Sequence, residues 1–402
     1  MKFNTYLMSD LIADISMGPF GSNIKAECYQ DQGVPYLNGS NVSGFSLNEE
    51  SFRYVSEEKA DSLGRSVARR NDIIVTHRGT LGQIAYIPND SKFERYVTGN
   101  SQFRFTCNEK VLPEYVVLYF HTPKGQHELL SNASQVGVPA LARPTSTFQK
   151  LSIDIPDLEH QRKICSIFHS IQDKIELNSA INENLEQQAQ SCFRELFVDN
   201  ADPEWTTGTI SDLGAVVGGS TPSKAKPEYY TESGIAWITP KDLSVNKSKF
   251  ISHGENDITE LGLKNSSASI MPKGTVLFSS RAPIGYIAIA AGEVTTNQGF
   301  KSVIPKPEIG TPFVYFFLKH NLPVIEGMAS GSTFKEVSGS TMKNIPAVIP
   351  DAETLARFND FCAPIFAQQC ILGEQSQSLA ALRDNLLPKL MSGEIDVSDI
   401  QL

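Results

Sequence analysis

The residues that could perform catalysis do not form a recognisable catalytic motif in this sequence. GGSTPSK at 218–224 is only superficially like a phosphate-binding loop, because it lacks the length that wraps a phosphate. Pro156-Asp157 followed by Glu159 faintly resembles a nuclease carboxylate set, but no acidic-x-Lys pair follows, and a helix cap explains Asp157 better. The H-E-x-x-H and G-x-S-x-G motifs are absent, as is the Pro-Pro pair with which adenine methyltransferases grip their target amine. We therefore predict a chain without catalytic activity of its own.

Cysteine and histidine spacing gives no sign of a metal site. The six cysteines, at 28, 107, 165, 192, 362 and 370, form no C-x-x-C pair, and the seven histidines are isolated from one another. The N-terminus lacks the apolar segment of a secretory signal, and no uncharged apolar run approaches the ~20 residues of a membrane span. We expect a cytoplasmic protein with free thiols, no metal or cofactor of its own, and no membrane partner.

The chemistry that remains is recognition of a polyanion by basic and polar residues in expected loops. Arg and Lys bind phosphates, and Arg, Lys, Asn, Gln and Ser can reach base edges in a DNA groove. The candidates in the first half of the chain are Ser22, Asn23, Lys25, Arg65, Arg69, Arg70, His77 and Arg78. Those in the second half are Lys224, Lys226, Lys241, Lys264, Lys273 and Arg281. A solvated surface charge is the alternative for each, and Arg78 and Arg281 could instead brace a turn.

The net charge of −10, from 35 basic and 45 acidic residues, is concentrated in two short segments. Residues 156–200 carry 4 basic and 8 acidic residues, and residues 349–402 carry 3 and 8, which together give −9. Residues 1–155 (15 basic, 16 acidic) and 201–348 (13 and 13) are nearly neutral. Net acidity argues against a polyanion partner, and this division weakens that objection.

The elements that would position the candidate residues occur twice along the chain. The matching segments are SDLIADISMGPFGS at 9–22 with SDLGAVVGGSTPS at 211–223, GVPYLNGSNV at 33–42 with GIAWITPKDL at 234–243, NDIIVTHRGTLGQIAYI at 71–87 with KGTVLFSSRAPIGYIAI at 273–289, and IPDLEHQ at 155–161 with IPDAETL at 349–355. Arg78 falls against Arg281 in this alignment. Four matches in the same order indicate a duplicated unit of about 200 residues.

Each copy begins with a domain of mixed character. Residues 1–155 and 201–348 alternate short β-branched runs with Gly, Pro, Asn and Ser, which predicts strands joined by turns. A helix is expected at 113–121 and another at 312–320, where a proline suits the first helical position.

Each copy ends with a long helix, at 156–200 and at 349–402, and the second helix is followed by a C-terminal tail. Asp157 and Asp351 are the expected N-caps. Alternation by four and three over more than four heptads predicts a coiled-coil seam in helices ~60 Å long. Equal length and matched seams favour antiparallel pairing within the chain, and a partly exposed surface helix is the alternative. The apolar seam residues are Ile164, Phe168, Ile171, Ile175, Leu185, Leu196, Phe358, Ile365, Leu372, Leu379, Leu386 and Leu390.

Over its whole length the sequence resembles the specificity subunit of a type I restriction-modification system. The resemblance rests on Gly219-Ser220-Thr221-Pro222-Ser223-Lys224, on GIAWITPKD at 234–242, on Arg78-Gly79-Thr80-Leu81-Gly82, and on the IPD sequence with a long helix that ends both copies. The first copy departs from the pattern at Gly18-Pro19-Phe20-Gly21-Ser22, and the second has Pro283 in place of a glycine near Arg281.

The resemblance implies an α+β fold, with two mixed α/β target-recognition domains related by internal duplication and joined and separated by two long antiparallel coiled-coil helices. Each domain would read one half of a bipartite, asymmetric site in double-stranded DNA. The helices would fix the gap and dock two methyltransferase subunits, which use S-adenosylmethionine. Motor-nuclease subunits that use ATP and Mg could join them, and the whole complex would work in a bacterial or archaeal cytoplasm.

The alternative function is a duplicated protein–protein adaptor that docks partners on its helix pair and does not read DNA. The basic loops at 65–70 and 222–226 favour DNA reading. Because the two domains are nearly neutral, we expect the isolated chain to bind DNA weakly and its complex with the methyltransferase to bind tightly.

Overall fold

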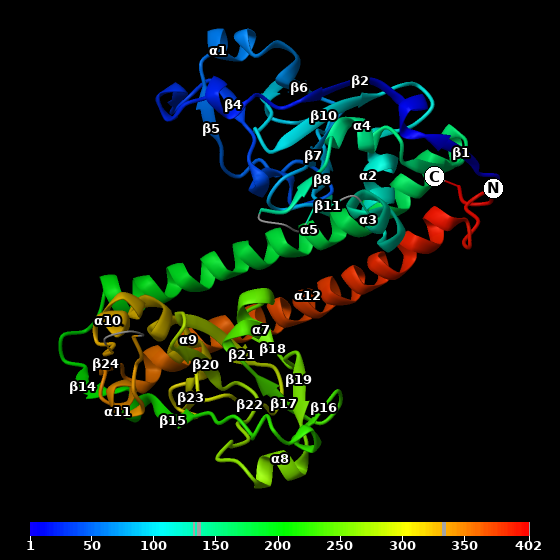
Figure 1. The fold of residues 1–402 in the computed structure, drawn as a ribbon. Helices are drawn as coiled ribbons and strands as arrows, with labels where there is room; N and C mark the ends of the chain where they lie inside the picture. Colours follow the sequence, from blue (N-terminus) through cyan, green and yellow to red (C-terminus); the bar gives the residue numbers. More distant parts are fainter. Residues whose placement is uncertain (132, 135–137, 332–334, 402) are drawn as a thin grey trace. The chain divides into compact units, whose positions relative to one another are not determined.

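The computed structural model shown in Figure 1 describes residues 1–131, 133–134, 138–331 and 335–401. The chain divides into two compact units. The first unit comprises Met1–Asp173 and Leu379–Leu402, and the second comprises Lys174–Ser378. Each unit thus contains one mixed domain and a section of both long helices. The boundaries at 155, 200 and 348, which were drawn from the sequence repeat, stay a prediction.

The domain of the first unit is built mainly of antiparallel sheets. β1 (Asn4–Leu7) pairs with β13 (Ser152–Ile155), and the central sheet has the order β2 (Ile12–Met17), β10 (Gln102–Cys107), β7 (Asp72–Thr76), β8 (Ile84–Tyr86). A second sheet has the order β3 (Tyr29–Gln30), β5 (Arg53–Val55), β4 (Val34–Tyr36), β9 (Arg95–Val97), β6 (Val67–Arg69), and β11 (Ala133–Ser134) pairs with β12 (Ala140–Leu141). The helices are α1 (Glu57–Ser62), α2 (Pro113–His121), α3 (Pro123–Leu130) and α4 (Pro144–Phe148), with short 3₁₀ turns η1 (Met8–Asp10), η2 (Gly21–Asn23), η3 (Ala26–Cys28), η4 (Gly39–Val42) and η5 (Gly64–Ser66).

Helix α2 confirms the prediction for 113–121 and lies at the centre of the first core. Pro113 occupies its first turn, where a missing N–H costs nothing, and every side chain from Tyr115 to Phe120 is buried. The same core contains Phe103 and Phe105 of β10. Burial of each large apolar side chain contributes about 1.5–3 kcal/mol, so this all-round apolar helix is stable only inside a core.

The second unit repeats this plan with small changes. β14 (Thr206–Thr209) pairs with β24 (Pro346–Ile349), and the central sheet has the order β15 (Gly214–Gly218), β23 (Lys301–Pro305), β20 (Val276–Ser280), β21 (Ile284–Ala290), β18 (Phe250–Ile251). A second sheet has the order β16 (Tyr230–Thr231), β19 (Asn256–Ile258), β17 (Ile235–Ile238), β22 (Thr295–Thr296). The helices are α6 (Ile210–Leu213), α7 (Pro240–Val245), α8 (Glu260–Lys264), α9 (Thr311–His320), α10 (Leu322–Gly327) and α11 (Gly339–Lys343), and η7 (Pro227–Tyr229) is a 3₁₀ turn. Helix α9 confirms the prediction for 312–320 and is buried from Phe313 to Leu318.

Two long helices, α5 (Leu158–Arg194) and α12 (Ala352–Ser392), run through both units, and a π-helical turn η6 (Glu195–Asp199) follows α5. With 37 and 41 residues they are ~55 and ~60 Å long. In the first unit Gln172 accepts a hydrogen bond from Arg383, while His160 contacts Ser398. The contacts run in opposite sequence directions, so the helices are antiparallel there.

The helices are antiparallel in the second unit as well. Asn178 Nδ2 donates to Ser376 Oγ at 3.3 Å, and Gln369 Nε2 donates to Asn182 O at 3.0 Å. The predicted apolar seam residues are all buried or partly buried. Some also contact the domains, since the ring of Phe168 lies 4.5 Å from that of Phe45.

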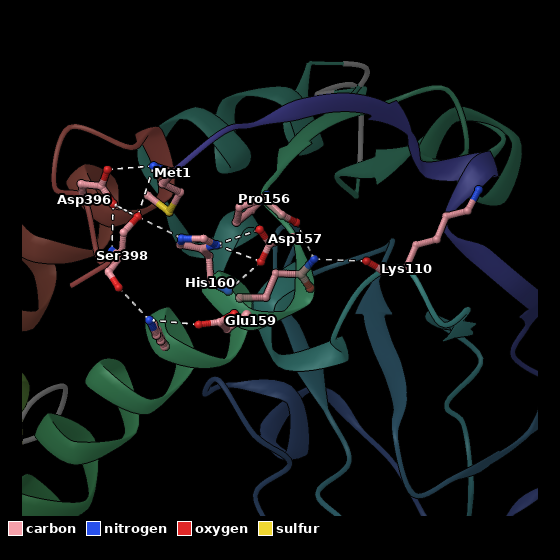
Figure 2. Close-up of polar contacts among 10 residues, drawn as sticks. Met1, Lys110, Pro156, Asp157, Glu159, His160, Asp396 and Ser398 are labelled. Atoms are coloured by element: carbon pink, nitrogen blue, oxygen red, sulfur yellow. Dashed lines mark hydrogen bonds and ion pairs between the residues drawn. The ribbon is translucent and has the colours of Figure 1, made fainter. Parts of the chain in front are cut away.

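Capping by aspartate begins both long helices, as predicted. Figure 2 shows the start of α5, where Asp157 Oδ1 accepts the backbone N–H of His160 at 3.1 Å. The His160 ring also lies 3.0 Å from Ser398 Oγ, and Lys163 Nζ donates to Ser398 O at 2.9 Å, so the C-terminal tail is fastened to the first turns of α5. The backbone and ring of His160 lower the pKa of Asp157. Asp351 caps α12 in the same way, accepting the N–H of Thr354 at 2.8 Å.

A partly buried polar network fastens the second domain to the helices, and it is made by Glu186, Lys249, Tyr315, Lys319 and Gln369. Lys249 and Lys319 each place Nζ 2.7 Å from the Glu186 carboxylate, and Lys249 Nζ also lies 3.5 Å from the Phe366 ring centroid. Burial opposes ionisation of Glu186, but the two lysines outweigh it and lower its pKa. Burial lowers the pKa of Lys249 to about 8 despite its pairing with Glu186.

The first domain is fastened by different chemistry. Here the cation is Arg383 of helix α12. Its guanidinium lies 5.3 Å from the Phe45 ring centroid and donates to Gln172 Oε1 at 2.8 Å. Phe45 in turn packs on the His121 ring at 4.3 Å. The two domains thus share a plan but not the residues that hold them on the helices.

Candidate nucleic-acid interface

A polar pocket lies at the turn that follows β7 in the first unit. Its volume is about 350 Å³, and its lining includes Tyr36, Asn38, Arg78, Thr80, Asn100 and Gln102. Arg78 and Asn100 are exposed, whereas Tyr36 and Gln102 are buried. The pocket therefore has a fixed floor and a rim of groups suited to base edges and phosphates.

A loop from Gly18 to Lys25 is pressed against this pocket. Gly18 N donates to Gln102 O at 2.8 Å, and a Cβ at Gly18 would lie only 2.0 Å from Gly99 O. Because no other residue fits that approach, the glycine holds the loop against the turn formed by residues 99–102. The candidates Ser22, Asn23 and Lys25 on this loop are exposed, and Lys25 lies 3.8 Å from Glu27.

The second unit holds the corresponding loop against the matching turn with its own copy of these segments. A Cβ at Gly219 would lie 2.0 Å from Asn297 O, and Ser220 N donates to Thr296 O at 2.9 Å. Trp237 Nε1 donates a hydrogen bond to Ser220 O at 3.0 Å, which also holds the loop in place. Lys224 on the same loop is exposed, and Lys226 Nζ lies 5.3 Å from the Tyr229 ring centroid.

His77 and Arg78 follow β7 directly but differ in character. Burial lowers the pKa of His77, and its Nε2 has no hydrogen-bond partner in the described part of the chain. A partly buried imidazole whose pKa is lowered is a poor phosphate ligand. Arg78 extends to the pocket rim, so of this pair it has the better position for DNA contact.

The other arginines of the first set do not join Arg78. Arg69 and Arg70 precede β7 and Arg78 follows it, so a five-residue strand, ~13 Å from first to last Cα, separates them. Arg70 donates to Ser91 O at 2.7 Å. Arg65 pairs with Asp14 and donates to Ile15 O at 3.1 Å, which braces β2. We find one loop-and-pocket surface with Arg78, and a separate basic pair at the other end of the strand.

The second set is divided in the same way. Arg281 follows β20 and lies 3.7 Å from Glu336, whereas Lys273 precedes β20. Lys241 on α7 pairs with Glu255 at 2.6 Å, and Lys264 ends α8. Only Lys224, Lys226 and Arg281 belong to the loop or strand end that correspond to the first pocket.

Sequence reasoning missed several residues of these surfaces. Asn100 and Gln298 occupy matching turns, each closed by an N–H to O bond from Gln102 to Gly99 (3.1 Å) and from Phe300 to Asn297 (3.3 Å). Lys301 lies 3.4 Å from Glu336, the residue that also faces Arg281. The signal was available, because a short polar turn precedes a strand in both copies, although its residues differ.

Membrane-spanning helices and metal-binding clusters are both absent from the described ranges. None of the helices there combines the length and apolarity needed to cross a membrane. Nor do His, Cys, Asp or Glu side chains gather in threes within these ranges in a way that could ligate a metal ion.

Comparison with known proteins gives consistent matches. The family model described as type I restriction modification DNA specificity domain matches twice, over residues 14–187 and 203–372, which confirms the predicted duplication. The chain is 43% identical over 163 residues to the type I restriction enzyme MjaIX specificity subunit of Methanocaldococcus jannaschii, a match that covers 40% of this chain and only 38% of that protein. It is 25% identical over 417 residues to the HindI specificity subunit of Haemophilus influenzae, covering 82% of this chain and 88% of that protein.

A solved structure shares the fold. The crystal structure of the S subunit of the type I restriction-modification system from M. genitalium superposes with a TM-score of 0.61 at 16% identity, covering 97% of this chain and 96% of that one. The predicted combination of two mixed α/β domains with long helices is thereby confirmed.

Proposed function

The chain belongs to the type I restriction-modification DNA specificity family, and on that premise we propose that it reads a bipartite DNA site for a type I restriction-modification complex. The glycine-held loop carries this proposal, because it occurs in both copies and in the first copy borders the polar pocket. Both copies hold a loop through a glycine whose close contacts leave no room for a side chain, and both carry an arginine within two residues of the end of the central strand. The glycine contacts that hold the two loops match, whereas the side chains at the ends of the loops differ.

Two loops that are held in the same way but carry different side chains suit two domains that recognise different DNA sequences. Each loop and the turn beside it offer Arg, Lys, Asn or Gln side chains, which are the ones that discriminate base edges. Because the tips differ, the two half-sites differ, and the site is asymmetric. The adaptor alternative is not favoured, since the family model and the two named relatives are a DNA specificity domain and specificity subunits.

The chemistry of such a complex resides in its partners. Two methyltransferase subunits that use S-adenosylmethionine dock on the long helices, and motor-nuclease subunits that use ATP and Mg complete the restriction form. Exposed apolar side chains on the helices support this, namely Leu177 (52% exposed) and Ile181 (37%) of α5 and Phe361 (42%) and Ile371 (48%) of α12. Exposure of these apolar side chains to water is unfavourable, and their burial against a protein partner would lower the free energy. The chain is itself non-catalytic and acts in the cytoplasm, where the host DNA lies.

The test is a map of N6-methyladenine in cells that express the partner methyltransferase with or without this chain. The proposal predicts one bipartite motif, methylated on both strands, that disappears when the chain is omitted. Methylation at many unrelated sites, or no chain-dependent methylation when the complex forms, would contradict it.

A further inference from the structure

Phe20 is an aromatic side chain in an unusual place. It is 80% exposed, although it stands on the loop pressed against the polar pocket of the first domain. A phenyl ring there adds nothing to the core. Single exposed apolar residues need no explanation by themselves, so the argument depends on how this one is held and on what surrounds it.

The backbone of Phe20 is fixed on both sides. Gly18, two residues before it, is locked against the 99–102 turn, and Asn23 N donates to Phe20 O at 2.8 Å, which closes the loop after it. A Cβ at Gly21 would lie 3.5 Å from Asn100 Nδ2, so the residue after Phe20 touches the pocket rim. The backbone that carries the exposed ring is therefore held by hydrogen bonds next to the exposed Asn100.

The matching position in the second domain carries a different group. Thr221 stands two residues after Gly219, as Phe20 stands two residues after Gly18, and Gln298 matches Asn100. Thr221 Oγ1 donates to Gln298 Oε1, so this pair is polar and internally bonded. The same scaffold thus presents an apolar ring with an amide in one domain and a hydroxyl–amide pair in the other.

The A·T base pair presents groups that complement an apolar ring next to an amide side chain. On the major-groove edge of an A·T pair, thymine exposes its C5-methyl group and adenine exposes N7 and N6–H₂, which Asn binds in a bidentate fashion. We propose that Phe20 contacts the methyl group of one thymine in the first half-site, with Asn100 placed to bind the adenine of the same pair. This inference rests on the proposed function and adds to it a residue that determines specificity.

Deoxyuridine tests the contact directly, because it differs from thymidine only by that methyl group. Once the site is mapped, the complex of this chain with its methyltransferase is titrated with duplexes in which each thymine of the first half-site is replaced in turn. We expect one replacement to weaken binding about fourfold, the value for one buried methyl group. The same replacement should not affect the complex that carries Phe20→Ala, whose affinity for the unmodified site should itself be at least fourfold lower than that of the wild type.

Controls separate this contact from general effects. Leu7→Ala removes another exposed apolar side chain (47% exposed) of the same domain, on β1, and should keep the full sensitivity to deoxyuridine. Asn100→Ala should relax the requirement for adenine at the same base pair and at no other. A first half-site without thymine, or equal sensitivity in wild type and Phe20→Ala, would overturn the inference while leaving chain-dependent methylation intact. Loss of chain-dependent methylation itself would instead contradict the proposed function.

Discussion

Glu186→Gln is the substitution that most sharply tests how the second domain is held on the helices. The change keeps the size of the side chain and removes its charge. Lys249, whose side chain is 10% exposed, then loses the carboxylate 2.7 Å from its Nζ, and Lys319 loses the same partner. A buried cation without its anion is among the few single changes that destabilise a protein severely.

The expected magnitude follows from the surroundings of Lys249. Removing one partner of a buried ion pair costs about 3–5 kcal/mol. The lower end applies here, because Lys249 keeps Gln369 Oε1 at 2.9 Å and the Phe366 ring at 3.5 Å. Its pKa of about 8 also limits the penalty, since the amine can release its proton near neutral pH. We expect the free energy of unfolding to fall by about 3 kcal/mol, and the Tm of the transition of the second unit, Lys174–Ser378, to fall by roughly 6–12 °C.

Scanning calorimetry of the whole chain at pH 7 measures this loss. Glu255→Gln is the matched control, because Glu255 pairs with Lys241 at 2.6 Å but both side chains are 60–67% exposed, and such pairs contribute about 0–1 kcal/mol. Adding Lys249→Met to Glu186→Gln should recover part of the loss by removing the orphaned cation. A loss for Glu186→Gln no greater than that for Glu255→Gln would refute the reasoning.

Further outcomes follow from other groups. The folded pKa of Lys249 (about 8) lies below its ordinary value of 10.5, so the unfolded chain binds more protons between those values. Its contribution to stability should rise by up to about 3 kcal/mol from pH 8 to 10.5, which urea unfolding of wild type and Lys249→Met, compared at pH 7.5 and 10, would reveal. Arg104, 10% exposed, lies 2.8 Å from Asp14 and 3.6 Å from Asp72. Arg104→Ala should therefore lower the free energy of unfolding by about 3 kcal/mol. Arg78→Ala should change that free energy by no more than ~0.5 kcal/mol. If Arg78 contacts a phosphate, Arg78→Ala should also reduce the salt slope of DNA binding by the methyltransferase complex by about 0.9. Titration of labelled site DNA should show weak binding by the isolated chain and tight binding by that complex; tight, specific binding by the chain alone would contradict the account.

Local sequence signals predicted the elements well. Proline at a helix start located α2 and α9, and aspartate before an apolar repeat located the caps of α5 and α12. These signals depend on residues within one or two turns of each other, so they can be read without knowledge of the fold. The duplication extended them, because each weak signal occurred twice in the same order.

Contacts between distant residues could not be read in the same way. Arg65 was a DNA candidate, but it pairs with Asp14, 51 positions earlier, and a sequence gives no distance between them. Gln369 likewise meets Lys249 of the second domain, 120 positions earlier. The separation of Arg69 and Arg70 from Arg78, in contrast, followed from the length of the strand between them and was open to prediction.

The most direct test of the central claim is exchange of one domain. Residues 1–155 are replaced by the corresponding segment of another specificity subunit, and the N6-methyladenine motif is mapped again with the same methyltransferase. The account predicts that one half-site changes. The other half-site should stay as it was because it depends on the second domain, and the gap should stay as it was because it depends on the helices. A change in both halves, or the original motif retained after the exchange, would contradict the claim that each domain reads its own half of the site.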